Sequence, residues 1–388
     1  KSVPCFVPRA RAYVPLPVHS SRTDRTILAM GGDLKNCFAL ARRDFISLSQ
    51  HLGDMRDPVT FAAFKRTVDH FISIFDAAPD TIAADLHPGY VTTQYADELA
   101  ASMGSEPVKV QHHHAHIASV LEDHSVDGPV LGVAFDGTGY GPDGTLWGSE
   151  FLVADRTGYR RAGHFSYFSL PGGENAIRDV WKIGLSLLLN AGLDAGPRWS
   201  RLNPGPVAEI IRRGINAPPT CSIGRLFDGV SALLGLAESI STEAEAAILL
   251  EEAACGVRAP GDNYHIPWKD KGNLLEVDSA ELVRYILHLQ KRGRSTGEIA
   301  AAFHDAIVDT AIQVLEELRS RTGIATVAVS GGVLHNRRIL EGIIEKTTEK
   351  KFHLLLPCKV PVNDGCIALG QAAVVKVLKL MGENTQKL

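Results

Sequence analysis

The sequence has few cysteines, and none of them forms a CxxC pair. The six cysteines are scattered through the chain: Cys5, Cys37, Cys221, Cys255, Cys358 and Cys366. Scattered single cysteines are typical of reduced, mostly buried thiols and argue against a disulfide framework or a paired-cysteine zinc site. We therefore expect a cytoplasmic protein.

The sequence also lacks long apolar runs, a signal peptide and a dense stripe of Lys and Arg. No run reaches the roughly 20 apolar residues that span a bilayer. The formal net charge is −4, which argues against a nucleic-acid surface. We expect neither a membrane nor a nucleic acid as a partner. The first residue is Lys1 rather than Met, which indicates a piece of a longer protein.

What the chain does have is the size and composition of a two-lobed globular protein. It contains 388 residues, of which 45% are hydrophobic and 22% charged, and single cores stop growing below this length. A strand, a turn rich in Gly and Asp, and two further strands occur twice, at residues 26–50 and 130–167. In the first copy the two further strands are residues 37–44 and 45–54. The repeat predicts two similar α/β lobes that face each other across a ligand cleft.

The expected boundaries follow from this repeat and from local signals. Residues 1–20 are Pro-spaced and predict a linker, residues 21–128 form the first lobe, and residues 129–388 form the second lobe. A helical insertion is expected at about residues 174–322. Helices are expected to begin after the capping residues Asp57, Asp278 and Ser295, and one helix to end at Gly323.

Two histidines four residues apart predict a metal site. If the segment after Gln111 is helical, His112 and His116 lie on one face and offer two imidazoles to one cation. Asp136 follows a short buried strand, at the end where α/β sheets bind ligands. Imidazoles with carboxylates suit zinc or iron better than magnesium. A solvated helix start explains the histidines equally well.

Three turns rich in glycine are candidates for binding an anion or a nucleotide. Gly137, Thr138 and Gly139 follow Asp136 and would let backbone N–H groups approach a phosphate, although a hairpin turn has the same pattern. The other two turns precede helices: Gly172 and Gly173 with Arg178, and Gly331 and Gly332 with Asn336. For the first of these, a plain loop-to-helix connection is at least as consistent with the spacing.

Asp364 is a second carboxylate at the start of a helix. The helix dipole favours a negative charge there, so Asp364 serves as a simple N-cap without further explanation. As a fourth ligand it would complete a set of two histidines and two aspartates with His112, His116 and Asp136.

Taken together, the motifs resemble the C-terminal part of the HypF family, the carbamoyltransferases of [NiFe]-hydrogenase maturation. The resemblance rests on HHHAH (112–116), FDGTGYGPDGTLWGSEF (135–151), LPGGENAIRDVWK (170–182), GRLFDGVSALLGL (224–236), VSGGVLHNRRIL (329–340) and NDGCIALGQA (363–372). These segments keep the family's order and cover nearly the whole chain.

The resemblance implies a two-lobed fold of the actin, Hsp70 and sugar-kinase type, abbreviated ASKHA, with ribonuclease-H-like lobes and a nucleotide cleft between them. It implies one divalent metal, iron or zinc, held by residues matching His112, His116, Asp136 and Asp364. It further implies that Lys35 contacts the phosphate, while Gly172, Gly173, Arg178, Gly331, Gly332 and Asn336 contact the adenosine part of an ATP-derived carbamoyl-adenylate.

The same resemblance implies a reaction and partners. In HypF, an upstream YrdC-like domain makes carbamoyl-adenylate from carbamoyl phosphate and ATP. The domain that this chain resembles passes the carbamoyl group to the C-terminal cysteine of HypE, where it becomes the cyanide ligand of the hydrogenase iron. The YrdC-like domain is not in this sequence, so the chain alone is not expected to make the adenylate. The alternatives are a tRNA threonylcarbamoyl transferase like TsaD and a non-catalytic nucleotide-binding scaffold.

Overall fold

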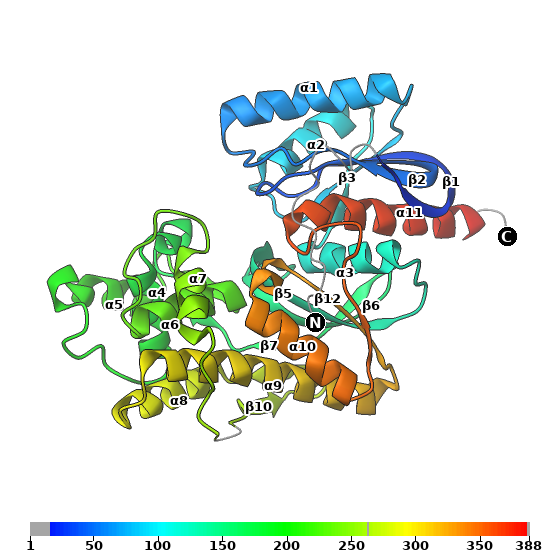
Figure 1. The fold of residues 1–388 in the computed structure, drawn as a ribbon. Helices are drawn as coiled ribbons and strands as arrows, with labels where there is room; N and C mark the ends of the chain where they lie inside the picture. The colour runs from blue at the N-terminus through cyan, green and yellow to red at the C-terminus, as the bar shows by residue number, and fades with distance from the viewer. Residues whose placement is uncertain (1–15, 262–263, 386–388) are drawn as a thin grey trace.

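The computed structural model describes residues 16–261 and 264–385 and contains two β-sheets (Figure 1). The first sheet has the strand order β2-β1-β3-β4. Its strands are β1 (Val18–Ala29), β2 (Ala39–Leu48), β3 (Thr81–Asp85) and β4 (Val108–Val110). β1 is antiparallel to β2 and parallel to β3. The helices α1 (Pro58–Ile74) and α2 (Val91–Ser102) cover one face of this sheet with an aromatic core that includes Phe38, Phe64 and Phe71.

The second sheet repeats this arrangement around β5 (Val130–Tyr140). β5 is antiparallel to β6 (Leu146–Ala154) and parallel to β12 (Thr326–Ser330), which in turn pairs in parallel with β13 (His353–Leu355). β7 (Tyr159–Phe165), β11 (Leu275–Val277) and β10 (Trp268–Asp270) extend the sheet beyond β6. Both faces of β5 are buried, which explains its nearly continuous apolar sequence.

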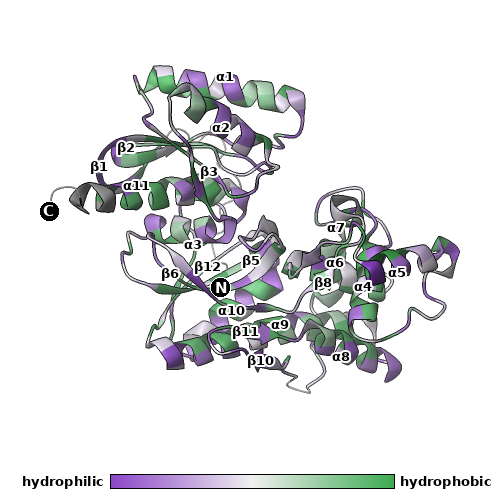
Figure 2. Ribbon diagram, turned by 180° about the vertical axis from the view of Figure 1, so that it is seen from behind, coloured by the Kyte–Doolittle hydropathy of each residue, from purple (hydrophilic) through white to green (hydrophobic). Residues whose placement is uncertain are grey.

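Two helices form a layer between the sheets. α3 (His112–Asp123) packs on β5, β6 and β12 through Ile117, Val120 and Leu121, while Ala115 and Ala118 on its other side join the core beneath the first sheet. α11 (Ile367–Thr385) lies beside α3 and packs on β1 and β2. Hydrophobic residues recur along α11 in this position (Figure 2). The site described below is built where these two helices begin.

The remaining helices pack beside the second sheet and share one core with it. They are α4 (Val180–Asn190), α5 (Pro204–Arg213), α6 (Ile223–Leu233), α7 (Glu245–Ala254), α8 (Ser279–Lys291), α9 (Thr296–Thr322) and α10 (Arg337–Glu349). The predicted caps are confirmed: Asp57, Asp278 and Ser295 each accept a backbone N–H at a helix start, and Gly323 ends α9 with φ 74°. Within the described residues, no helix combines the length and the apolar character needed to cross a lipid bilayer.

The structure differs from three sequence-based expectations. A single strand, β2 (Ala39–Leu48), lies where the sequence predicts two strands over residues 37–54. β1 begins at Val18, inside the expected linker at 1–20, most of which lies outside the described residues together with Cys5. α11, expected in the second lobe, returns to the first sheet because its buried residues Ala368, Ala372 and Val375 pack there.

Candidate metal centre and nucleotide cavity

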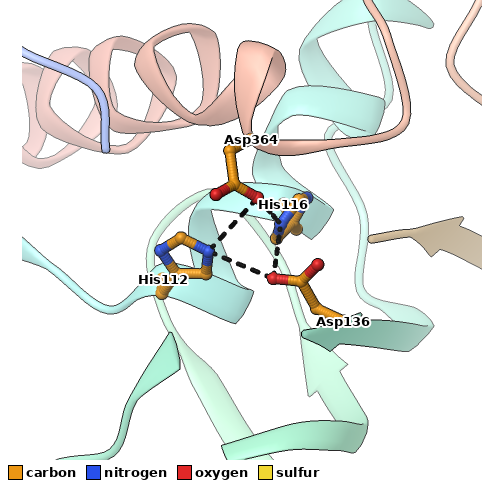
Figure 3. A group of neighbouring side chains, drawn as sticks. All are labelled: His112, His116, Asp136 and Asp364. Carbon is orange, nitrogen blue, oxygen red and sulfur yellow. Dashed lines mark ion pairs between the residues drawn. The ribbon is translucent and has the colours of Figure 1, made fainter. Parts of the chain in front are cut away.

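Four side chains from distant parts of the chain converge at the N-terminal ends of α3 and α11. His112 and His116 come from α3, Asp136 from β5, and Asp364 from the short 3₁₀-helix η5 (Asp364–Cys366) before α11 (Figure 3). His112 Nε2 lies 3.4 Å from Asp136 Oδ2 and 3.8 Å from Asp364 Oδ1. His116 Nε2 lies 3.6 Å and 3.7 Å from the same two oxygens. The predicted set of two histidines and two aspartates is therefore assembled.

The local sequence explains why the side chains point inward. Gln111 caps α3 by accepting a hydrogen bond from the backbone N–H of His114, so the helix begins at His112 and one turn later presents His116 on the same face. On β5 the register with β6 shifts between Phe135 and Gly139, which interrupts the ladder at Asp136. A Cβ on Gly139 would lie 2.5 Å from His113 Cε1, so only glycine fits beside the histidines.

The cluster fits a divalent cation. Both Nε2 atoms are buried and have no hydrogen-bond partner among the described residues, and unpaired buried polar atoms are costly in a native protein. The four ligand atoms lie within 4.8 Å of one another. A cation with bonds of about 2.0–2.2 Å separates its ligand atoms by roughly 3–3.6 Å, close to the four separations above. The two imidazoles and two carboxylates therefore form a ligand set that fits such a cation.

Further hydrogen bonds orient three of the four ligands. His112 Nδ1 lies 2.7 Å from Asp85 Oδ2, and because a carboxylate only accepts, Nδ1 carries the proton and Nε2 faces the cluster. His116 Nδ1 lies 3.0 Å from Ser330 Oγ. Gly332 N–H donates to Asp136 Oδ1 at 2.9 Å, which leaves Oδ2 for a cation. Asp85 and Ser330 end β3 and β12, so the two sheets fix the two imidazoles.

Asp85→Asn is expected to weaken metal binding by about 10–100-fold while leaving the fold intact. The amide keeps the shape of the carboxylate but removes the charge that fixes the His112 tautomer. Zinc competition with a chromophoric chelator measures the loss. The conservative Asp97→Asn, which removes an exposed carboxylate paired with Lys109, serves as the control. Equal affinities for Asp85→Asn and Asp97→Asn would show that Asp85 does not support the ligand.

The electrostatics of the metal-free cluster predict a pH dependence. Burial lowers the pKa of His112, but Asp85, Asp136 and Asp364 outweigh it and hold that pKa well above its ordinary value. The pKa of His116 is also raised against burial, by Cys366 and the two cluster carboxylates. The pKa values of Asp136 and Asp364 are lowered, although burial opposes this, because the two neighbouring imidazoles favour the charged carboxylates. When no metal is bound, the positive charges of the protonated imidazoles thus balance the negative charges of the carboxylates.

Metal affinity is therefore expected to rise with pH. A cation needs the Nε2 lone pairs, so binding displaces the protons that the raised pKa values hold on His112 and His116 at neutral pH. Each displaced proton makes the affinity rise about tenfold per pH unit until the pH exceeds that raised pKa. Zinc calorimetry in two buffers of different ionisation enthalpy counts the protons. Affinity independent of pH between about pH 6 and pH 8, without proton release, would contradict this charge balance.

A cavity of about 440 Å³ opens directly from the cluster. Asp136 and Asp364 belong to its wall, and so do several residues predicted to bind the nucleotide: Lys35, Gly137, Thr138, Gly332 and Asn336. The remaining lining residues include Leu34, Gly224, Arg225, Phe227, Asp228, Glu243, Ala244, Ala247, Ile248, Glu251, Val333 and His335. Lys35 forms an ion pair with Glu243, which joins the first lobe to the helical part across the cavity. The volume falls within the range of small-molecule sites.

The other predicted nucleotide residues do not reach this cavity. Gly331 has φ 111°, and a Cβ there would lie 2.2 Å from the carbonyl oxygen of Phe135, so its role is close packing against β5. Gly172 N–H donates to the carbonyl oxygen of Asn216 in a loop, Gly173 follows it, and Arg178 is exposed. None of these residues, nor Gly139, lines the cavity.

Sequence reasoning missed the polar pair in the cavity wall. Arg225 Nη2 lies 2.9 Å from Asp228 Oδ2 on α6, yet both oxygens of Asp228 and Nε of Arg225 lack a hydrogen-bond partner among the described residues. Burial raises the pKa of Asp228 to about 6, and Arg225 opposes the rise. The signal was present in the GRLFDG segment, where Arg225 and Asp228 stand three apart on an otherwise apolar helix. The pair gives the cavity unused hydrogen-bonding capacity.

Comparisons with known proteins cover almost the whole chain. Residues 132–371 match the model of the carbamoyltransferase Kae1-like domain, second subdomain, and residues 22–123 match that of the HypF Kae1-like domain. The carbamoyltransferase HypF of Synechocystis sp. is 36% identical over 95% of this chain and 49% of its own length. A carbamoyltransferase HypF homolog from Cupriavidus necator is 32% identical over 90% of this chain and 91% of its own length.

The structural comparison agrees. The crystal structure of full-length HypF in a phosphate- and nucleotide-bound form has a TM-score of 0.87 and 33% identity, and covers 96% of this chain and 49% of that chain. The chain therefore spans about half the length of the full-length relatives that it matches. By contrast, a tRNA N6-adenosine threonylcarbamoyltransferase from Clostridium beijerinckii matches only 20% of the chain.

These matches confirm the predicted fold class. The chain has the two-lobed ASKHA-type α/β architecture, with related sheets in both lobes. The sequence and structure matches cover both sheets and the segments that carry the cluster, and this coverage establishes the family. The chain belongs to the HypF carbamoyltransferase family, of which it forms the Kae1-like C-terminal part.

Proposed function

We propose that this chain transfers a carbamoyl group from carbamoyl-adenylate to the C-terminal cysteine thiol of HypE, in the synthesis of the cyanide ligand of [NiFe]-hydrogenase. One observation carries the proposal: Asp136 and Asp364 belong both to the cation cluster and to the wall of the cavity. A ligand in the cavity therefore lies against the metal ligands. Cytoplasmic location and a separate YrdC-like domain as the source of the adenylate are part of the same proposal.

The cavity suits a nucleotide with its phosphate toward the cluster. Gly137 lines the cavity without a side chain that would keep an anion away from its backbone, and Lys35 supplies a positive charge. Although burial lowers the pKa of Lys35, the carboxylates of Asp364, Glu243 and Asp136 raise it overall, so its ammonium group stays charged at neutral pH. Arg225 and Asp228 offer unused donors and acceptors to the ribose. Ala247 and Ile248 supply an apolar wall for the base.

The metal we propose is iron or zinc. The donor set contains two imidazole nitrogens, whereas magnesium prefers oxygen ligands. A divalent cation bound there would act as a Lewis acid on the carbamoyl or phosphate oxygens. The protein's own part is to present the four ligands and to hold three of them, His112, His116 and Asp136, through hydrogen bonds with Asp85, Ser330 and Gly332.

The nucleophile comes from the partner. None of the residues that line the cavity is a cysteine, so the chain supplies no thiol there. The partner's sulfur forms a bond to the carbamoyl carbon, the bond from that carbon to the phosphate oxygen breaks, AMP leaves with the electron pair, and the thiol loses its proton. This step needs no oxidant or reductant.

AMP release with defined acceptors tests the proposal. The metal-loaded chain receives carbamoyl-adenylate from a separate YrdC-like domain, and the acceptor is HypE, HypE with its terminal cysteine replaced by alanine, or tRNA. We expect rapid AMP release only with intact HypE. Release with tRNA when threonylcarbamoyl-adenylate replaces carbamoyl-adenylate would establish the threonylcarbamoyl-type alternative. Nucleotide binding without release for any acceptor would establish a scaffold.

A further inference from the structure

His335 lines the cavity beside the cation cluster but is not part of it. It ends the 3₁₀-helix η4 (Gly332–His335), which connects β12 to α10, and its side chain is exposed to the cavity. Lys35, Asp136 and Glu243 are close enough to act on it electrostatically. Histidines at such positions act either as proton acceptors or as hydrogen-bond donors, and the two roles depend on which ring nitrogen carries the proton.

The neighbouring amide decides which nitrogen is protonated. Asn363 Oδ1 accepts a hydrogen bond from the backbone N–H of Gly365 at 3.1 Å. Because a backbone N–H only donates, this contact fixes the orientation of the amide, and Asn363 Nδ2 is left to donate to His335 Nε2 at 3.0 Å. His335 Nε2 is therefore an acceptor, and in the neutral ring the proton is on Nδ1.

The ring is neutral, and its free nitrogen is a donor. Burial lowers the pKa of His335, and the Lys35 ammonium lowers it further. Nδ1 has no hydrogen-bond partner within the described residues. His335 thus presents an N–H group in the cavity wall that also contains the Lys35 ammonium. Two hydrogen-bond donors on one side of a cavity favour a ligand with an anionic oxygen there over a ligand with a donor group there.

We propose that His335 Nδ1–H donates a hydrogen bond to a phosphate oxygen of the bound adenylate, next to Lys35, and that it does not act as a base. The inference rests on the proposed binding of an adenylate in the cavity and adds a residue that distinguishes the phosphate. A base at this position would need a free lone pair, and Asn363 already occupies the one on Nε2.

Calorimetric titration of the metal-loaded chain with AMP and with adenosine tests the inference. His335→Leu removes the donor and is expected to weaken AMP binding roughly tenfold or more, because hydrogen bonds to charged groups are the strong ones. Adenosine lacks the phosphate, so its affinity should change by less than about twofold. His335→Gln restores a side-chain N–H and should keep AMP affinity within about threefold of the unmodified chain. Metal content and thermal stability, measured for each variant, verify that the cluster is intact.

Three results would overturn the inference: unchanged AMP affinity in His335→Leu, equal losses for AMP and adenosine, or a His335→Gln variant as weak as His335→Leu. Either of the first two results would show that His335 does not contact the phosphate. The third would show that a side-chain N–H at this position is not enough for AMP binding. Failure of the unmodified chain to bind AMP would be a different outcome, since it would overturn the proposed adenylate site itself.

Discussion

His116→Ala is expected to lose both stoichiometric metal and carbamoyl transfer. His116 is fully buried and its Nε2 lies 3.6 Å and 3.7 Å from the two cluster carboxylates. Removing a ligand should cost more than the 10–100-fold in affinity that is typical for residues behind the ligands, so we expect a loss of at least about 100-fold. It also leaves two buried carboxylates facing one imidazole. Metal analysis of the purified chain and the transfer assay measure the two losses.

His114→Ala is the matched control. His114 lies on the same helix and is also buried, but its Nε2 donates to the carbonyl oxygen of Asp155, away from the cluster. We expect this variant to lose some stability and to keep its metal and its transfer activity. A metal-free His116→Ala variant with normal transfer would contradict the proposed mechanism, and a metal-free His114→Ala variant would show that the helix, rather than the ligand, is responsible.

Gly370→Ala is expected to have the largest effect on stability. A Cβ at Gly370 would lie 1.8 Å from the carbonyl oxygen of Ala115, where α11 crosses α3. The obstacle is backbone, so the two helices must separate, which we expect to cost about 3 kcal/mol in free energy of unfolding. Because α3 carries the histidines and α11 follows Asp364, the same separation should weaken metal binding. Urea unfolding and zinc titration measure both effects.

Gly205→Ala provides the comparison for that variant. Gly205 lies on α5, and the nearest atom to a Cβ there is Asn203 Oδ1 at 3.9 Å, an ordinary contact. Alanine favours a helix over glycine, so stability should stay the same or rise by up to about 1 kcal/mol. If both variants unfolded at the same urea concentration, the close crossing of α3 and α11 would not be a determinant of stability.

The cluster could be predicted in large part because its ligands carry local signals. Helical spacing related His112 to His116, and a helix start marked Asp364. The end of a predicted apolar strand marked Asp136, although β5 in the structure continues through Asp136 to Tyr140. Asp85 carries the same kind of signal, since it ends β3, but only the folded chain shows that β3 delivers it to His112. Hydrogen bonds that form only when the two lobes meet, such as that between Ser330 and His116, cannot be predicted from local sequence patterns.

The features that local patterns predicted wrongly have physical causes. The predicted boundary between strands 37–44 and 45–54 does not exist, because β2 continues through Arg42, Arg43 and Asp44, with Arg43 at φ 53°. The position of α11 depends on its packing partners, because an apolar helix fits either sheet. The binding role of Gly172 and Gly173 stays a prediction: they do not line the cavity, and their spacing before a helix is the same in a phosphate-binding loop and in a plain connection.

The most direct test of the central claim is the mass of the C-terminal peptide of HypE after incubation with this chain, zinc or iron, and carbamoyl-adenylate supplied in trans. We expect the addition of one carbamoyl group on the terminal cysteine, its absence with His116→Ala, and its presence with His114→Ala. An unmodified cysteine in every reaction, with the chain metal-loaded and AMP bound, would contradict the account of this chain as a carbamoyltransferase.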